Sequence, residues 1–246
     1  MTSEKIRFGE LDLLRALAVI LMIAYHLLYD LKMYYGIGIN PFSAPMFALE
    51  RFVANLFLLL VGVSFAISFG RMKEQNSSMY AILKRYWLRG LLIIACGMFV
   101  TVATYLADPT TYVRFGVLHL IGTSLLVLPF LMPLKEWNAL LAIFILALNY
   151  FVGGHDVSTS FLLPFHLLPA SFTSVDYFPL LPWLAPILIG AAIGNSLYVR
   201  RILQRHIFLG RRLSFLSIPS RYALAIYLVH QPILLGILLL LLGKPS

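Results

Sequence analysis

Residues 11–31 read LDLLRALAVILMIAYHLLYDL, an apolar run about as long as a helix that crosses a bilayer, since roughly 20 residues at ~1.5 Å each span ~30 Å of hydrocarbon. The run nevertheless contains Asp12, Arg15, His26 and Asp30. Each ionisable group near a bilayer centre costs about 2.5 kcal/mol or more. At ~100° per residue the four side chains lie on one narrow stripe. We therefore expect the stripe to face a bundle interior or a water-filled cavity rather than lipid.

The composition of the chain is that of an integral membrane protein. Of its 246 residues, 61% are hydrophobic and 12% are charged, and a soluble domain of this size could not hide so much apolar surface. We expect a single domain over residues 1–246. Cys96 is the only cysteine, and the six histidines have no spacing typical of metal ligands. No metal is expected.

Apolar length predicts an all-α integral membrane protein, a bundle of about seven transmembrane helices. The fifth span is short, at about 16 residues. Residues 153–178 form the longest connection, and the prolines of SFLLPFHLLP within it argue against a regular spanning helix. We expect a partly re-entrant or interfacial segment there. The seven spans are 11–31, 47–70, 80–106, 113–132, 137–152, 179–199 and 220–242.

Lysine and arginine indicate the orientation, because cytoplasmic flanks of membrane helices carry an excess of them. One set of connections holds fourteen of these residues and the other only three, Lys32, Arg114 and Lys244. The amino terminus is therefore expected to be cytoplasmic and, with seven spans, the carboxyl terminus outside. The net charge of +9 then needs no nucleic-acid partner, since basic flanks are attracted to anionic lipid headgroups. The fourteen are Lys5, Arg7, Arg71, Lys73, Lys84, Arg85, Arg89, Lys135, Arg200, Arg201, Arg205, Arg211, Arg212 and Arg221.

The stripe of the first span contains two local pairs. Asp12 and Arg15 are three residues apart and can form an ion pair, either a structural one at the membrane surface or one whose arginine reaches a ligand phosphate. His26 and Asp30 are four residues apart, so a carboxylate can orient the imidazole for general-base catalysis. The alternative is an interior histidine that bonds a backbone carbonyl. Glu50, in the second span, is a plausible partner of His26 or of Arg51.

Further polar groups lie in or beside later spans. His119 is flanked by Gly116 and Gly122, which suggests close packing around a polar cavity, and Thr123 could hydrogen-bond it. A functional and a structural role for His119 are equally compatible with this pattern. His230 and Gln231 precede Pro232, which predicts a kinked helix beside a polar pair.

The segment before the sixth span is expected to form an outer mouth. Asp176 and Tyr177 lie there, followed by Trp183 as an interfacial or cavity-wall residue. Three prolines in DYFPLLPWLAP would bend the start of the helix.

Five stretches in this order resemble the short prokaryotic branch of the heparan-alpha-glucosaminide N-acetyltransferase catalytic-domain family: ELDLLRALAVILMIAYHLLYDL, FLLLVGVSFAIS, RFGVLHLIGTSLLVLPFL, FTSVDYFPLLPWLAPILIGAAIGNSLY and ALAIYLVHQPIL. The resemblance runs over nearly the whole chain. The first-helix pair Arg15 and His26 is also similar to a motif of the membrane acyltransferase type-three family. Both families are understood to share a transmembrane acyltransferase fold.

These resemblances imply an acyltransferase that takes acetyl from cytoplasmic acetyl-CoA and delivers it to an extracytoplasmic sugar or glycan. They imply His26 as the catalytic base and place Arg15 near the donor. The animal glucosaminide enzymes carry their reactive histidine in the loop after the first helix, and here that loop, KMYYGIGINPFSAP, has none. The assignment of His26 therefore follows the type-three motif. A multi-pass protein of a prokaryotic plasma membrane is expected.

The predicted site combines these residues. Arg71, Lys84, Arg85 and Arg89, or the cluster Arg200–Arg212, would hold the phosphates of acetyl-CoA. His26, oriented by Asp30 or Glu50, would deprotonate an amine or hydroxyl approaching past Asp176, Tyr177 and Trp183. His119, His230 or Tyr227 would stabilise the oxyanion.

Two other functions fit the same features. One is a proton-coupled membrane transporter, against which the absence of an internal repeat counts. The other is a structural or assembly subunit, and a homo-oligomer also stays open.

Overall fold

The computed structural model describes residues 8–155, 157, 159–200 and 222–244, and no strand occurs among them. The chain divides into two compact units, Met1–Phe57 with Arg205–Ser246, and Leu58–Gln204. The single domain over residues 1–246 stays a prediction.

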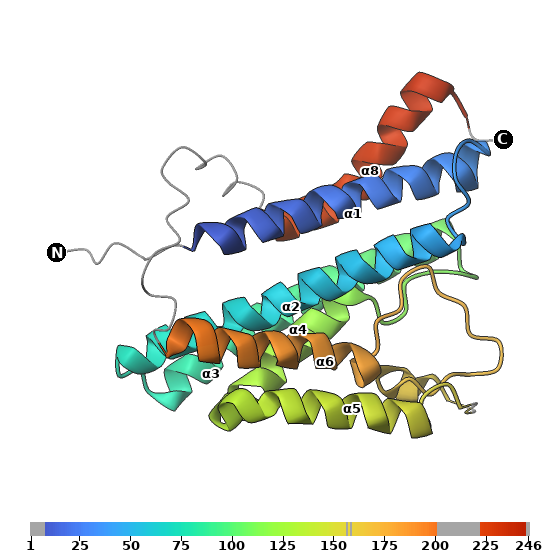
Figure 1. Cartoon of the computed structure of the whole chain (residues 1–246). Coiled ribbons are helices and arrows are strands. Elements are labelled where there is room, and N and C mark those ends of the chain that lie inside the picture. The colour runs from blue at the N-terminus through green and yellow to red at the C-terminus, as the bar shows by residue number, and fades with distance from the viewer. Residues whose placement is uncertain (1–7, 156, 158, 201–221, 245–246) are drawn as a thin grey trace. The chain divides into compact units, whose positions relative to one another are not determined.

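Seven α-helices occur among the described residues, and the prediction of an all-α membrane bundle is confirmed. All seven lie on the predicted spans, with ends that differ by a few residues. Three shorter elements are the 3-10 helices η1 (Met132–Trp137) and η2 (Ser160–Phe165) and the π-helix η3 (Gly194–Val199). The α-helices are α1 (Gly9–Tyr35) and α8 (Ala223–Leu242) in the first unit, α2 (Ala44–Glu74), which runs from the first unit into the second, and α3 (Met79–Ala107), α4 (Val117–Leu131), α5 (Asn138–Val152) and α6 (Leu180–Ile193) in the second (Figure 1).

The fourth and fifth spans differ most from full-length membrane helices. By apolar length they form one 36-residue stretch, Val117–Val152, and six such stretches among the described residues could cross a membrane. The element η1, with Pro133 near its start and Lys135 at φ 53°, divides this stretch into two helices of 15 residues each. Such a helix is ~22 Å long, less than the ~30 Å of a hydrocarbon core. The predicted number of seven membrane crossings is therefore approximate.

In the described part of the long connection between α5 and α6, the short helix η2 is the only helical element. Its second half docks on the segment before α4, where the Val175 N–H donates to the Thr111 carbonyl at 2.8 Å and the Phe178 N–H to the Phe115 carbonyl at 2.7 Å. The absence of a spanning helix here agrees with the sequence, because the prolines interrupt helical hydrogen bonding. A re-entrant path stays a prediction.

Two glycines set the distance between α2 and α6 in the second unit. A Cβ atom on Gly62 would lie 1.9 Å from the Ile187 carbonyl oxygen, and one on Gly190 would lie 2.0 Å from the Leu59 carbonyl oxygen. The atoms that such a Cβ would meet belong to the backbone of the facing helix, so the clash could not be relieved by a side-chain movement. Close crossings of this kind gain dispersion energy in a bilayer, where apolar side chains gain nothing by leaving lipid.

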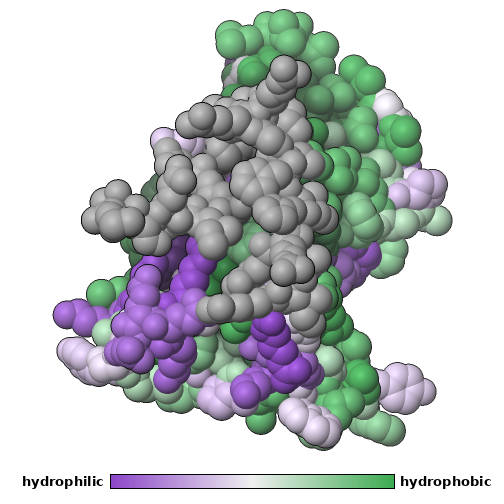
Figure 2. Space-filling view, turned by 60° about the vertical axis from the view of Figure 1, so that its left-hand side comes forward, coloured by the Kyte–Doolittle hydropathy of each residue, from purple (hydrophilic) through white to green (hydrophobic). Residues whose placement is uncertain are grey.

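Large apolar side chains cover the outside of the helices. On α3, Leu88, Leu92, Phe99 and Leu106 are each 59% exposed or more. Figure 2 shows hydrophobic residues over wide parts of the visible surface, with hydrophilic residues gathered in clusters. Hydrocarbon is the solvent that suits such a surface.

We predict that Gly190→Ala and Gly62→Ala each lower the melting temperature of the purified protein in detergent, because the new methyl group forces α2 and α6 apart. Gly236→Ala in α8 is the matched control, since a Cβ there meets nothing within 4 Å and alanine favours a helix by about 1 kcal/mol. The measurement is thermal unfolding followed by intrinsic fluorescence. Equal melting temperatures for Gly190→Ala and Gly236→Ala would contradict the close crossing.

Candidate active site

The ionisable groups of α1 enter two separate sets of contacts. Near the start of the helix, the Arg15 guanidinium donates to Asp12 Oδ1 at 2.8 Å, which confirms the predicted ion pair. The pair is half-buried, and ion pairs that water still reaches contribute about 0–1 kcal/mol. Stability alone is therefore a weak reason for an arginine at this position.

His26 is held by the backbone of its own helix. Its Nδ1 atom lies 2.8 Å from the Met22 carbonyl oxygen. A carbonyl only accepts hydrogen bonds, so Nδ1 carries the proton in this contact and Nε2 keeps its lone pair. The ring of His230 packs against His26 with centroids 4.7 Å apart at 80°. The geometry thus presents His26 Nε2 as a base.

Asp30 has a different partner from the predicted one. It is fully buried, and both its carboxylate oxygens accept from the Gln231 amide, at 2.8 and 2.9 Å. The expectation that Asp30 orients His26 was wrong, because Met22 already holds the imidazole and α8 brings an amide to the carboxylate. Asp30 instead ties α1 to α8.

Glu50 also has another partner. The Tyr25 hydroxyl hydrogen-bonds the Glu50 carboxylate, whereas His26 or Arg51 was expected. The tyrosine ring stands edge-on to His26, with centroids 5.7 Å apart. Glu50 therefore acts on a neighbour of His26 rather than on the imidazole itself.

His26, Asp30, His230 and Gln231 form what we call the α1–α8 polar cluster. His230 is only 7% exposed, and its Nδ1 atom lies 2.7 Å from the Tyr227 carbonyl oxygen. Its Nε2 atom and the Gln231 Oε1 atom are buried without a hydrogen-bond partner among the described residues. A buried polar atom without a partner costs about 1–3 kcal/mol. The cluster therefore contains acceptor atoms whose donors the described residues do not supply.

His119 lies in the second unit, and its imidazole rests on Gly97, where a Cβ would come within 3.0–3.3 Å of three ring atoms. Both ring nitrogens are buried without a partner within the described part of the chain, so the hydrogen bond expected from Thr123 is not formed. The ring turns toward the space that Gly97 leaves. His119 belongs to the second unit and His26 to the first.

The three predicted outer-mouth residues shape the loops before α4 and α6. Asp176 Oδ2 accepts from the Val117 N–H at 3.2 Å and so caps the start of α4. The Tyr177 hydroxyl donates to the Leu163 carbonyl at 2.6 Å, and burial raises the pKa of Tyr177 above its usual range. Trp183 is buried against Phe178, with ring centroids 4.5 Å apart. All three have a structural role, and their contact with a substrate stays a proposal.

Four of the five predicted donor-binding residues gather around the turn between α2 and α3. Arg71 lies in the last turn of α2, and Lys84, Arg85 and Arg89 follow in the first turns of α3. The last three are exposed, as the binding of a soluble anion requires. Arg15, the fifth, belongs to the other unit.

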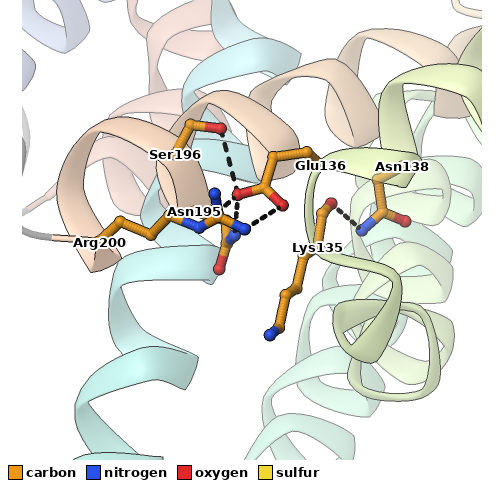
Figure 3. Close-up of polar contacts among 6 residues, drawn as sticks. All are labelled: Lys135, Glu136, Asn138, Asn195, Ser196 and Arg200. Carbon is orange, nitrogen blue, oxygen red and sulfur yellow. Dashed lines mark hydrogen bonds and ion pairs between the residues drawn. The ribbon is translucent and has the colours of Figure 1, made fainter.

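Arg200 is engaged with an acidic partner. Its guanidinium donates to Glu136 in η1, with Nε 2.9 Å from Oε1, and Asn195 and Ser196 of η3 donate to the same carboxylate (Figure 3). This network ties the α4–α5 connection to the end of α6. The alternative phosphate site at Arg200–Arg212 therefore begins with an arginine that already has a carboxylate. Arg201, Arg205, Arg211 and Arg212 lie outside the described residues.

The family with the description "Heparan-alpha-glucosaminide N-acetyltransferase, catalytic" matches residues 7–232. The chain belongs to this family. The match covers α1 to α6 and the first half of α8, and therefore includes every residue of the α1–α8 polar cluster. No curated protein matches the chain. As a member of a glucosaminide N-acetyltransferase family, the chain is a transferase, and its apolar helices make it a multi-pass membrane protein.

Two residues were not among the predicted site residues: Tyr25, which borders His26, and Gln231, which binds Asp30. An amide inside an apolar helix, next to Pro232, is a signal that something polar must face it. Nothing in the sequence says that the partner is Asp30, 201 positions away.

We predict that Gln231→Leu destabilises the protein by about 1–3 kcal/mol, because Asp30 is left buried without its donor. Asp30→Leu should cost a similar amount, and the double variant less than the sum of the two, since neither side chain then lacks a partner. Denaturant unfolding in detergent micelles measures all three. Asp30→Asn, which keeps an acceptor oxygen for Gln231, is the control with the smaller effect. Additive losses would contradict the pairing.

Proposed function

We propose that this protein moves an acetyl group from acetyl-CoA on the cytoplasmic side to an amine or hydroxyl of an extracytoplasmic sugar or glycan. Membership of the N-acetyltransferase family supports the reaction type. The observation that carries the proposal is His26, an imidazole inside a membrane helix with its Nδ1–H on a carbonyl and its Nε2 lone pair available. General bases of this kind contribute 10²–10⁴-fold to a rate.

The proposed topology follows from the basic residues. With a cytoplasmic amino terminus, the turn between α2 and α3 is also cytoplasmic, and so are Arg71, Lys84, Arg85 and Arg89. The carboxyl terminus is then outside. A soluble, phosphate-bearing donor would thus meet exposed cations on the side where acetyl-CoA is made.

In this proposal the donor binds by its two ends. Arginine and lysine hold the nucleotide phosphates through charge-assisted hydrogen bonds. The thin pantetheine arm then runs between helices toward mid-membrane. The rise from Arg15 to His26 is about 16 Å along α1, and an extended arm can cover such a distance.

The acceptor would approach from the other side, over the loop that contains Asp176 and Tyr177 and the start of α6, where Trp183 lies. His26 Nε2 removes a proton from the attacking amine or hydroxyl, the new bond forms to the acetyl carbon, and the C–S bond breaks. A site inside the membrane excludes bulk water, which limits hydrolysis of the thioester. Tyr25, held by Glu50, borders the imidazole and limits its movement.

We predict that His26→Ala reduces acetyl transfer at least 100-fold while leaving binding of radiolabelled acetyl-CoA intact. The probe acceptor is glucosamine, and the released CoA thiol is measured. His155→Ala is the matched control, because this histidine is exposed, on the loop after α5. Wild-type rates in His26→Ala would remove His26 from the chemistry. No acetyl-CoA binding by the wild-type protein would favour a transporter or an assembly subunit instead.

We also predict that the double variant Arg85→Ala/Arg89→Ala raises the KM for acetyl-CoA about tenfold or more, because each lost phosphate contact weakens binding. The KM for S-acetylpantetheine, which lacks the nucleotide, should not change. Arg51→Ala, near the other end of α2, serves as the control. Equal effects on both donors would place the phosphate site elsewhere.

A further inference from the structure

The two imidazoles of the α1–α8 polar cluster are held in the same protonation pattern. His26 Nδ1 lies 2.8 Å from the Met22 carbonyl oxygen, and His230 Nδ1 lies 2.7 Å from the Tyr227 carbonyl oxygen. Each carbonyl belongs to the preceding turn of the same helix and can only accept. Both neutral rings therefore carry their proton on Nδ1 and a lone pair on Nε2.

This pattern changes the role that His230 can play. We expected it to donate a hydrogen bond to an oxyanion, but a neutral ring with a bare Nε2 has no proton to offer there. Nor is a donor available from its neighbour in the chain, because the Gln231 amide is engaged by both oxygens of Asp30. His230 Nε2 is buried and has no partner within the described ranges. It is fit to receive a proton, and only then to give one.

The ring of His230 is also close to the ring that takes the first proton. The centroids are 4.7 Å apart, and the rings meet edge to face. Asp30 and Gln231 fix the two helices next to this contact, so they act as positioning residues. Because the Nδ1 contacts limit rotation of each ring, a proton leaves or enters through Nε2.

We propose that His26 and His230 form a proton relay that connects the acceptor to the leaving group, an inference that rests on the proposed function. His26 Nε2 takes the proton from the attacking amine or hydroxyl as the bond to the acetyl carbon forms. The proton passes to His230 Nε2 once a turn of the imidazole brings that atom to His26 Nε2, because the two atoms are not hydrogen-bonded in the edge-to-face contact. When the C–S bond breaks, its electron pair goes to sulfur, and His230 returns the proton there to give the free thiol of CoA. Both rings end neutral, as they began.

The relay gives the proton two positions. The proton starts on the nucleophile, which forms the new bond to the acetyl carbon, and ends on the sulfur, whose bond to that carbon breaks. A second ring, pinned to another helix but in contact with the first, covers the second position.

The test uses the leaving group. With acetyl-CoA and glucosamine, His230→Gln should lower kcat about 100-fold with little change in KM. With S-acetyl-4-nitrothiophenol as donor, the thiolate leaves without a proton, so His230→Gln should recover to within a few-fold of the wild type. His26→Ala should stay inactive with both donors. His230→Gln that is equally impaired with both donors, or active with both, would overturn the relay.

The controls separate failure of the relay from failure of the proposed function. If the wild-type protein transfers acetyl and His230→Gln keeps its rate, the relay is wrong and the function stands; if the wild-type protein transfers none, the function is wrong as well. His230→Phe, which keeps a ring in the contact, should be as slow as His230→Gln with acetyl-CoA. Should neither variant fold, ¹⁵N spectra of histidine-labelled wild-type protein decide, since a protonated Nε2 on neutral His230 would contradict the proposal.

Discussion

Every polar group placed in hydrocarbon must find its partner within the protein, because no water is there to replace it. The helices meet this constraint for the backbone. Side chains meet it by returning to their own helix, as Ser124 does to the Leu120 carbonyl and Asn55 to the Arg51 carbonyl. The histidines of α1 and α8 do the same with Nδ1. Only where a side chain cannot return locally, as for the carboxylate of Asp30, does a second helix supply the partner.

Few buried polar side-chain atoms of the described residues lack a hydrogen-bond partner, and several of these atoms are histidine nitrogens or lie beside one. A histidine with a purely structural role would be expected to form hydrogen bonds through both ring nitrogens. In His230 the Nδ1 atom has a hydrogen-bond partner and the Nε2 atom has none, and in His119 neither ring nitrogen has one within the described residues. An open acceptor in a low-dielectric interior is costly unless a ligand or a proton uses it. Family membership points to the same chemistry independently, because acyl transfer to an amine releases a proton that a base has to take.

Apolar length sufficed to predict the helices, since the bilayer thickness sets a minimum run and the runs here are well separated. It also placed a break between the predicted spans 113–132 and 137–152, where η1 divides α4 from α5. The 3-10 form of that break was not predicted, because Pro133 and the positive φ of Lys135 act locally. The contents of the site were harder. Helical spacing indicated the Asp12–Arg15 pair of α1, and it suggested that Asp30 binds His26. In the structure, His26 binds the Met22 carbonyl of its own helix, and Asp30 binds the Gln231 amide of α8. Which distant side chain completes a buried group depends on helix packing, and one helix's periodicity contains no information about that.

Four carboxylates have partners other than a histidine in the contacts described above. Asp30 binds an amide, Glu50 a tyrosine, Asp176 a helix start and Glu136 an arginine with two side chains of η3. Each of these four carboxylates thereby holds elements together. A base assisted by a carboxylate would form a stabilised imidazolium and hold its proton. His26 and His230, held only by carbonyls, are less able to retain the charge, and a group that must pass a proton on within one reaction is better served by a weak hold than by a strong one.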